Sequence, residues 1–438
     1  MSAQSPATIT RPTGNTSQRW VICALLFFAI TIVYIGRGVV SFLAPSLEGV
    51  VPGMTVGHGY INGLTPDSYG HIAGCYMLAY AIGMALAGIL LDRLGTRRAF
   101  TLAVILWILA LLLLGFSFSV FTFGLFMFLL GIGEASNFPA CIKTVAEWFP
   151  KRERALATGI FNAGSNFGAI VAPLIVAFLV SLFHWRGAFR ASALFGVIWV
   201  CLWLIFYRHP EQSHLVGQPE LDLILSDPVE KVQRLPWSRI IGYKETWAFA
   251  IGKFLTDGIW WFYLFWLPTY FSDVYHLDLK ANRFPVVTVF AISAIGSVGG
   301  GYISSALIRR GKSANVARKT ALLICALAVV PVFFAPFIHH HLWGVVGLIG
   351  LATAAHQGWS ATLFTLPSDM FPKSAVGSVT GLGGMIGAGG GALMHLVVGH
   401  QAESHNYIPL FAYACSGYLL ALLIIHLLIP KLTPVKIE

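Results

Sequence analysis

Long apolar runs recur along this chain of 438 residues, and short segments with charged residues, proline or glycine separate them. An α-helix needs about 20 apolar residues to cross the hydrocarbon core of a membrane, and twelve runs reach that length. We therefore expect an all-α membrane protein. The predicted transmembrane helices lie at residues 20–44, 68–91, 98–118, 121–149, 155–182, 187–207, 246–272, 284–308, 317–338, 342–366, 374–398 and 407–430. The first run is too long for the core of a signal peptide, so we expect it to remain in the protein.

The first six runs and the last six resemble each other. Residues 147–151 read EWFPK and residues 369–373 read DMFPK, an offset of 222 residues. A repeat of half the chain length is typical of transporters that hold their substrate between two bundles near the middle of the membrane. We therefore predict two pseudo-symmetric six-helix bundles. The predicted domains are a tail at 1–19, a bundle at 20–207, a linker at 208–244, a bundle at 245–430 and a tail at 431–438.

Composition and charge agree with a membrane protein. Apolar residues make up 57% of the chain and charged residues 11%, which excludes a soluble enzyme and a disordered protein. With both termini in the cytoplasm, 21 of the 28 Lys and Arg residues fall on inner segments and four on outer ones. This asymmetry predicts a multi-pass protein of the cell (inner) membrane with both termini inside, and it explains the net charge of +10 without nucleic acid.

The segment between the second and third predicted helices carries the clearest motif. Residues 88–98 read GILLDRLGTRR. Its glycines allow close packing, and its acid can pair with the basic cluster as a latch that breaks during gating. The motif resembles the loop 2–3 signature of the major facilitator superfamily. The resemblance implies the twelve-helix fold of that family and a gating role for Gly88, Asp92, Arg93, Gly95, Arg97 and Arg98.

Further motifs resemble the anion:cation symporter branch of that superfamily. They are GEASNFPA at 133–140, EWFPK at 147–151 and KFLTDGIWWFY at 253–263, whereas RHPE at 208–211 and AHQ at 355–357 resemble its hexuronate group. The resemblance implies the import of organic anions, often sugar acids, together with protons. The chain departs from the branch at Gly36 and Met127, where many members have an acid and an arginine. With Gly36 in place of the acid, Glu134 is left as the main acidic candidate of the first half.

Three polar residues inside the predicted helices suggest chemistry. The guanidinium of Arg37 suits a substrate carboxylate, although an arginine can also extend to the outer headgroups. Glu134 can carry a proton, and we expect its charge to be uncompensated when it is ionised; the alternative is a structural carboxyl. His356 corresponds to Glu134 under the 222-residue offset, so both can point into a central cavity, or the imidazole can simply bond a neighbour.

Other side chains suit sugar hydroxyls or a sugar ring. Asn162, Ser165 and Asn166 share one helix face, but such residues also join helices together. Trp260, Trp261 and Trp359 can stack on a ring or pack in a core. The predicted substrate-binding set is Tyr34, Arg37, Tyr80, Asn162, Asn166, Trp260, His356 and Gln357. Two charge pairs at a spacing of four, Lys253–Asp257 and Lys143–Glu147, are interpreted as structural, with coupling by the first as the alternative.

Two other patterns are set aside. Residues 387–392 match a dinucleotide fingerprint, but no strand precedes them, and the His339–His341 run lies in an outer loop. The six cysteines show no metal or disulfide spacing, so we predict no metal and no cofactor.

The preferred function is a monomeric secondary transporter that imports a monoanionic sugar acid, a hexuronate, by proton symport. Another organic anion, such as an aldonate or aldarate, and a non-transporting anion sensor remain as alternatives. An enzyme is not expected, because no nucleophile–base pair is recognisable.

Overall fold

The computed structural model describes residues 16–47, 61, 63–226, 237–338, 340–371 and 373–435, and every regular element in this part of the chain is a helix. The helices of the first half are α1 (Gln18–Leu47), α2 (Pro66–Leu114), α3 (Val120–Ala135), α4 (Asn137–Trp148) and α5 (Lys151–Phe206). The linker carries η1 (Pro210–Gln212), α6 (Gln218–Ile224) and α7 (Trp237–Ile240). The second half contains α8 (Lys244–Tyr275), α9 (Leu279–Arg309), α10 (Ala314–Val329), η2 (Val330–Ile338), α11 (Leu342–Leu363), α12 (Thr365–Met370), α13 (Lys373–Glu403) and α14 (Ile408–Leu428).

These helices account for the twelve predicted membrane crossings. Nine described segments are long and apolar enough to cross a membrane. One of them has 51 residues and contains two crossings, because the backbone of His184 is not helical (φ 54°, ψ −178°). Helices α8 and α11 supply the remaining two; they are rich in aromatic residues, glycine and polar residues, which lowers their mean hydropathy. The predicted fold class is therefore confirmed.

Several predicted helices are divided. The crossings at 68–91 and 98–118 belong to α2 and are separated at Gly95, whose φ of 76° suits glycine. The predicted helix at 121–149 breaks at Ser136 between α3 and α4, three residues before Pro139, which has no N–H for the helix ladder. The predicted helix at 342–366 breaks at Phe364 ahead of Pro367 for the same reason.

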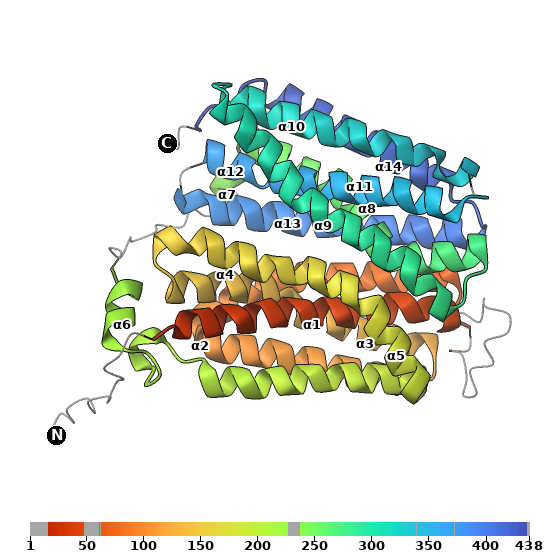
Figure 1. Cartoon of the computed structure of the whole chain (residues 1–438), viewed down its shortest axis with the longest axis horizontal. Helices are drawn as coiled ribbons and strands as arrows, with labels where there is room; N and C mark the ends of the chain where they lie inside the picture. The colour runs from red at the N-terminus through yellow and green to blue at the C-terminus, as the bar shows by residue number, and fades with distance from the viewer. Residues whose placement is uncertain are drawn as a thin grey trace.

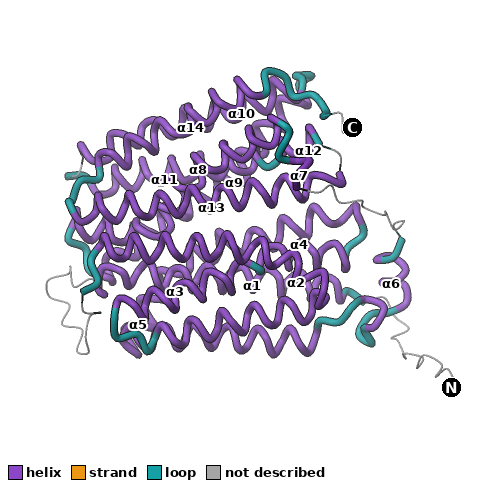
Figure 2. Tube along the Cα trace, turned by 180° about the vertical axis from the view of Figure 1, so that it is seen from behind, coloured by secondary structure: helices purple, strands orange, loops and turns teal. Residues whose placement is uncertain are grey.

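The helices form two bundles that lie side by side with their axes roughly parallel (Figure 1). Helices α1 to α5 make one bundle and α8 to α14 the other, and the view from behind shows the loops gathered at the two ends (Figure 2). The bundles meet through α2 with α13, α5 with α9 and α1 with α8. The start of α1 and the end of α14 lie at the same end of the molecule (Figure 1), which we call the terminal end; the other is the distal end.

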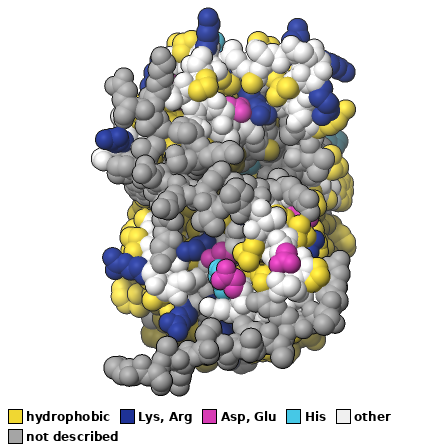
Figure 3. Space-filling view, turned by 90° about the vertical axis from the view of Figure 1, so that its left-hand side faces the viewer, with side chains coloured by type: hydrophobic (Ala, Val, Ile, Leu, Met, Phe, Trp, Pro, Cys, Tyr) yellow, Lys and Arg dark blue, Asp and Glu magenta, His cyan; other side chains and the backbone are white. Residues whose placement is uncertain are grey.

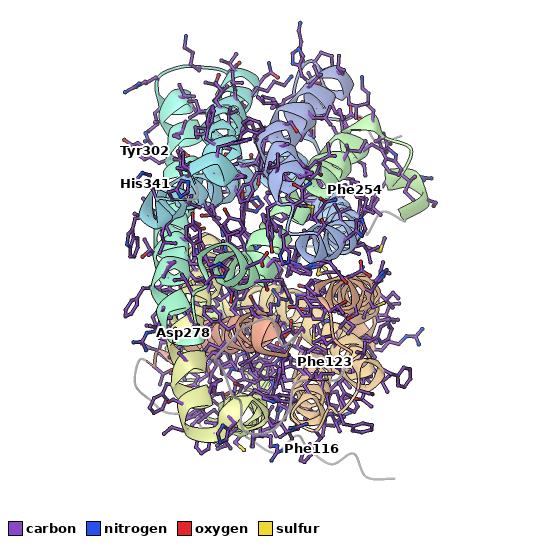
Figure 4. All side chains as sticks on the ribbon, turned by 90° about the vertical axis from the view of Figure 1, so that its right-hand side faces the viewer. Phe116, Phe123, Phe254, Asp278, Tyr302 and His341 are labelled. Atoms are coloured by element: carbon purple, nitrogen blue, oxygen red, sulfur yellow. The ribbon has the colours of Figure 1, made fainter. Side chains whose placement is uncertain are left out.

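The outer surface of both bundles is apolar. Phe121, Ile295 and Leu427 are 76%, 73% and 66% exposed. Seen from the distal end, Phe116 points outward at the edge of the first bundle, whereas Phe123 lies inside it (Figure 4). Exposed apolar side chains on this scale are stable against lipid rather than water.

The terminal end is basic. Figure 3 shows Lys and Arg side chains around the rim of this end. The exposed basic residues of the turn within α2 and of the α9–α10 connection are Arg93, Arg98, Arg309, Arg310 and Lys312.

The bundles touch at the distal end and separate towards the terminal end. A Cβ atom on Gly70 of α2 would lie 2.6 Å from the carbonyl oxygen of His395 and 2.8 Å from the Cα atom of Gly399, both on α13. Further along the same helices, the Cβ positions of Gly88 on α2 and Gly381 on α13 have no described atom within 4 Å. The structure is therefore open towards the terminal end.

The linker is hydrogen-bonded to the start of α1. Glu220 of α6 is buried, and its carboxylate accepts hydrogen bonds from the backbone N–H groups of Gln18 (3.0 Å) and Arg19 (3.1 Å). It also accepts from the Thr16 hydroxyl (2.5 Å) and the Arg19 Nη1 atom (3.0 Å). An acid at the first turn of a helix satisfies N–H groups that have no partner within the helix. This contact ties α6 to the first bundle.

Candidate functional site

A buried ion pair lies in the core of the first bundle. The Nε atom of Arg37 on α1 is 2.8 Å from the Oε2 atom of Glu134 on α3. The side chain of Arg37 is 5% exposed and that of Glu134 is fully buried. The expectation that Glu134 is uncompensated when ionised is therefore wrong, because the guanidinium of Arg37 balances its charge.

Two further side chains complete the environment of Glu134. The Tyr76 hydroxyl on α2 donates to Oε2 (2.5 Å) and accepts from Arg37 Nε (3.1 Å), and the Trp107 indole donates to Oε1 (3.0 Å). Both carboxylate oxygens of Glu134 are thus satisfied, which a buried carboxylate requires. Sequence reasoning did not identify Tyr76 or Trp107 as partners of Glu134. The sequence could have pointed to Tyr76, which lies four residues from Tyr80 on the same helix face. Nothing in the sequence distinguishes the Trp107 indole from the other apolar residues around it.

Aromatic rings surround the guanidinium of Arg37. Its Cζ atom is 5.0 Å from the ring centre of Tyr34, 5.3 Å from that of Tyr80 and 5.0 Å from that of Trp261. Tyr34 and Tyr80 belong to the first bundle and Trp261 to α8 of the second, so both bundles contribute to this cage. Only Nε of Arg37 forms hydrogen bonds with the described residues, and none is formed there by its two terminal amino groups.

The predicted amide residues lie where α5 approaches α11. The Nε2 atom of Gln357 is 3.4 Å from the Oδ1 atom of Asn166, a contact between the two bundles. Asn162, one turn closer to the terminal end, is exposed, and the Ser165 hydroxyl bonds to the backbone of its own helix (2.7 Å). Of these residues, Asn166 and Gln357 lie where the two bundles meet.

His356 belongs to a cluster inside the second bundle. Its Nδ1 atom is 2.7 Å from the Tyr418 hydroxyl, and its ring stacks on Trp260 with centres 5.0 Å apart. The histidine is 3% exposed, so the interpretation that it bonds a neighbour matches the structure. One face of Trp260 is covered by this contact. Trp359 is fully buried with its ring edge-on to Tyr418, which leaves Trp261 as the tryptophan beside Arg37.

The two predicted charge pairs have different outcomes. Lys253 and Asp257 form the expected contact, an ion pair of 2.7 Å. The second is wrong: Lys143 donates to the carbonyl of Leu91 (2.8 Å), and Glu147 accepts from the hydroxyls of Thr96 (2.6 Å) and Tyr207 (2.5 Å). Burial, reinforced by the nearby Glu147, raises the pKa of Tyr207, so its hydroxyl stays protonated and donates.

The gating motif lies at the terminal end. Arg93 and Arg98 are exposed, and Arg97 donates to the carbonyl of Leu204 (2.6 Å). The side chain of Asp92 lies outside the described part, as does His339 of the histidine run. Among the described residues, no three His, Cys, Asp or Glu side chains lie together as metal ligands.

Comparison with known proteins places this arrangement in a family. The family model described as the Major Facilitator Superfamily matches residues 26–395. The chain belongs to the major facilitator superfamily. It is a multi-pass membrane transporter and not an enzyme.

Relatives within the superfamily include sugar-acid transporters. The hexuronate transporter of Escherichia coli (strain K12) is 30% identical over 420 residues, which is 93% of each chain. The galacturonate transporter of Dickeya chrysanthemi is 27% identical over 73% of this chain and 93% of its own, and the D-galactonate transporter of Escherichia coli O6:H1 is 25% identical over 94% and 96%. These matches confirm the resemblance to hexuronate transporters.

Solved structures of other transporters share the fold. The xylose transporter XylE from E. coli, in a partially occluded inward open conformation, gives a TM-score of 0.69 at 16% identity, covering 95% of this chain and 98% of that one. A bacterial homolog of the human lysosomal transporter Spinster, inward-facing and occupied, gives 0.68 at 17% identity, with 95% and 96% coverage.

Proposed function

We propose that this protein imports a monoanionic sugar acid, a hexuronate, by proton symport across the cell (inner) membrane, with both termini in the cytoplasm. The observation that carries the proposal is the cage around Arg37. A guanidinium with two unoccupied amino groups presents the planar fork that fits a carboxylate in a bidentate manner. The relatives named as hexuronate and galacturonate transporters support the choice of cargo.

In this proposal, the ion pair between Arg37 and Glu134 couples proton binding to substrate binding. With both groups ionised the pair is neutral, and an approaching carboxylate would meet the charge of Glu134 behind the guanidinium. A proton on Glu134 removes that charge and leaves Arg37 as one uncompensated cation, which matches one carboxylate. The proton and the monoanion then bind together, and the loaded site carries the same net charge as the empty one.

The remaining side chains would recognise the sugar. The rings of Tyr34, Tyr80 and Trp261 offer faces for a pyranose, and the amides of Asn162, Asn166 and Gln357 suit its hydroxyls. The roles of Trp260 and His356 would be indirect, through the cluster with Tyr418. Trp261, Asn166 and Gln357 lie where the bundles meet. Rocking of the bundles would therefore separate these residues from their partners and then bring them together with the site open towards the other end.

Uptake by proteoliposomes tests the proposal. Labelled glucuronate and galacturonate should accumulate when the external buffer is more acidic than the lumen. Because one proton accompanies one monoanion, a membrane potential alone should not drive accumulation. Accumulation that is independent of the pH gradient would overturn proton symport, and the absence of any sugar-acid binding would overturn the choice of cargo.

A second candidate cargo is an aldonate. The D-galactonate transporter resembles this chain over nearly its whole length. An aldonate also carries one carboxylate and several hydroxyls, so competition of galactonate against labelled galacturonate would rank the two.

A further inference from the structure

Each bundle holds an embedded cation beside an acid, but the two pairs are built differently. Arg37 and Glu134 belong to different helices, so movement or protonation can separate them. Lys253 and Asp257 lie one turn apart on α8, with Nζ 2.7 Å from Oδ2. Because both residues belong to one helix, relative movement of the bundles leaves their contact intact.

The Lys253–Asp257 pair packs against residues of the second bundle, one to two turns before the part of α8 that meets the first bundle. Lys253, Asp257, Trp261 and Phe265 follow one another at intervals of four, so each lies about one turn from the next. Trp261 contacts Arg37 (5.0 Å), and the ring of Phe265 is 5.5 Å from that of Tyr76. Four residues of a helix span about 6 Å, so Asp257 lies about one turn from the Arg37 cage.

Helix α13 places the pair near α2. A Cβ atom on Gly387 would lie 3.3 Å from the Cβ atom of Lys253, and the Asp257 carboxylate is closer still. Gly384 and Gly391, one turn before and after Gly387, face the methyl groups of Met84 and Met77 on α2 at 3.5 and 3.1 Å. The pair therefore lies at the junction of α2, α8 and α13.

The pair retains some exposed surface. The side chains of Lys253 and Asp257 are 8% and 15% exposed. Within the described structure, the Asp257 carboxylate is the ion-pair partner of the Lys253 ammonium, which also lies 4.4 Å from the ring centre of Phe364. An ammonium has three donors, so removal of the Asp257 charge would leave a cation able to bind a second anion.

We propose that Asp257 restricts the cargo to one carboxylate by keeping Lys253 neutralised. This inference rests on the proposed function, in which Arg37 binds the first carboxylate. A dicarboxylic sugar acid would bring its second carboxylate towards the acid of an already neutral pair, and repulsion would exclude it. Galacturonate and galactarate share a six-carbon skeleton, and galactarate carries a carboxylate in place of the aldehyde, so it also cannot close to a ring. Galactonate, which is open-chain and has one carboxylate, is the control for the loss of the ring.

The experiment measures competition against labelled galacturonate in proteoliposomes of the full-length protein. In the wild type, galactarate should compete poorly. In Asp257→Asn, galactarate should compete at a concentration lower by about tenfold or more, the effect of one charge-assisted hydrogen bond. Asp257→Glu retains the pair and should behave as the wild type. Lys253→Gln combined with Asp257→Asn removes both charges and should lose the gain.

Two results would overturn the inference. One is a wild type that binds galactarate as tightly as galacturonate, which decides the matter even if Asp257→Asn does not fold. The other is an Asp257→Asn protein that binds galacturonate and discriminates against galactarate as before. A wild type that binds no sugar acid contradicts the proposed function instead, so the two failures are distinguishable.

Discussion

The Nε atom of Arg37 lies 2.8 Å from the Oε2 atom of Glu134, although 97 residues separate them along the chain. The two groups that we expect to bind the carboxylate and the proton are therefore direct partners. Any change in the charge of Glu134 acts on Arg37 without an intervening residue. The predictions for these two residues depend on this contact.

Arg37→Lys should weaken galacturonate binding. An ammonium keeps the charge but loses the planar two-point fit and the Nε bond to Glu134. The loss of one charge-assisted hydrogen bond costs about 1.5–3 kcal/mol, or roughly tenfold to a hundredfold in affinity. Equilibrium binding in detergent measures the effect. Arg190→Lys, where the arginine donates to the carbonyl of Gly115, is the matched control and should bind normally. Unchanged affinity in Arg37→Ala would show that the carboxylate binds elsewhere.

Glu134→Gln should separate exchange from accumulation. The amide imitates the protonated carboxyl, so Arg37 stays available, and labelled substrate should exchange across the membrane. Without a group that gains and loses a proton, accumulation against a gradient should fail. Counterflow and pH-driven uptake measure the two activities. Glu211→Gln, at an exposed position of the linker, should leave both intact. Normal proton-driven accumulation in Glu134→Gln would show that another group, such as Asp257, carries the proton.

Leucine substitutions at Gly70 and at Gly88 should favour opposite conformations of the transporter. Gly70 meets α13 closely, and a leucine there should disfavour closure of the distal end by about 1–3 kcal/mol. Gly88 faces open space, so a leucine there should be tolerated in the present state and should prevent closure of the terminal end. A cysteine at the exposed position Asn162 reports the difference. Its labelling from the terminal side should be slower in Gly70→Leu and faster in Gly88→Leu, and equal rates would contradict the gating roles.

Glu220→Ala should lower the thermal stability of the protein in detergent. The buried carboxylate accepts from two backbone N–H groups at the start of α1, from Arg19 and from Thr16. Removing it should cost about 2 kcal/mol or more, because these donors lose their partner. Asp222→Ala, on the same short helix but exposed, should change stability by less than about 0.5 kcal/mol. Equal melting temperatures for both variants would contradict the anchoring role.

The proposed topology, with both termini and the linker in the cytoplasm, rests on the distribution of the basic residues. A cysteine introduced at Ser226, which is exposed at the end of the linker helix, should not react with an impermeant thiol reagent added to intact cells. It should react after the membrane is opened. Reaction in intact cells would place the linker and both termini outside and would reverse the assigned direction of transport.

The helices and their number could be predicted because each crossing depends on its own residues. A run of about 20 apolar residues satisfies its backbone within the helix and buries its side chains in lipid, whatever the rest of the chain does. The same holds for the Lys253–Asp257 pair, since a spacing of four on one helix brings two side chains together without tertiary contacts. The repeat at 147–151 and 369–373 likewise indicated two bundles before any packing was known.

Contacts between helices were decided by the tertiary structure alone. The partners of Glu134 come from α1 and from both crossings of α2, and no local spacing relates Arg37, Tyr76 and Trp107 to it. The same limit explains why Lys143 and Glu147, four apart and of opposite charge, bond elsewhere: a carbonyl and two hydroxyls of neighbouring helices compete for them. Sequence determines which surfaces a helix can present. Only the packed bundle determines which of those surfaces meet, because a buried polar group bonds whichever partner the neighbouring helices bring within reach.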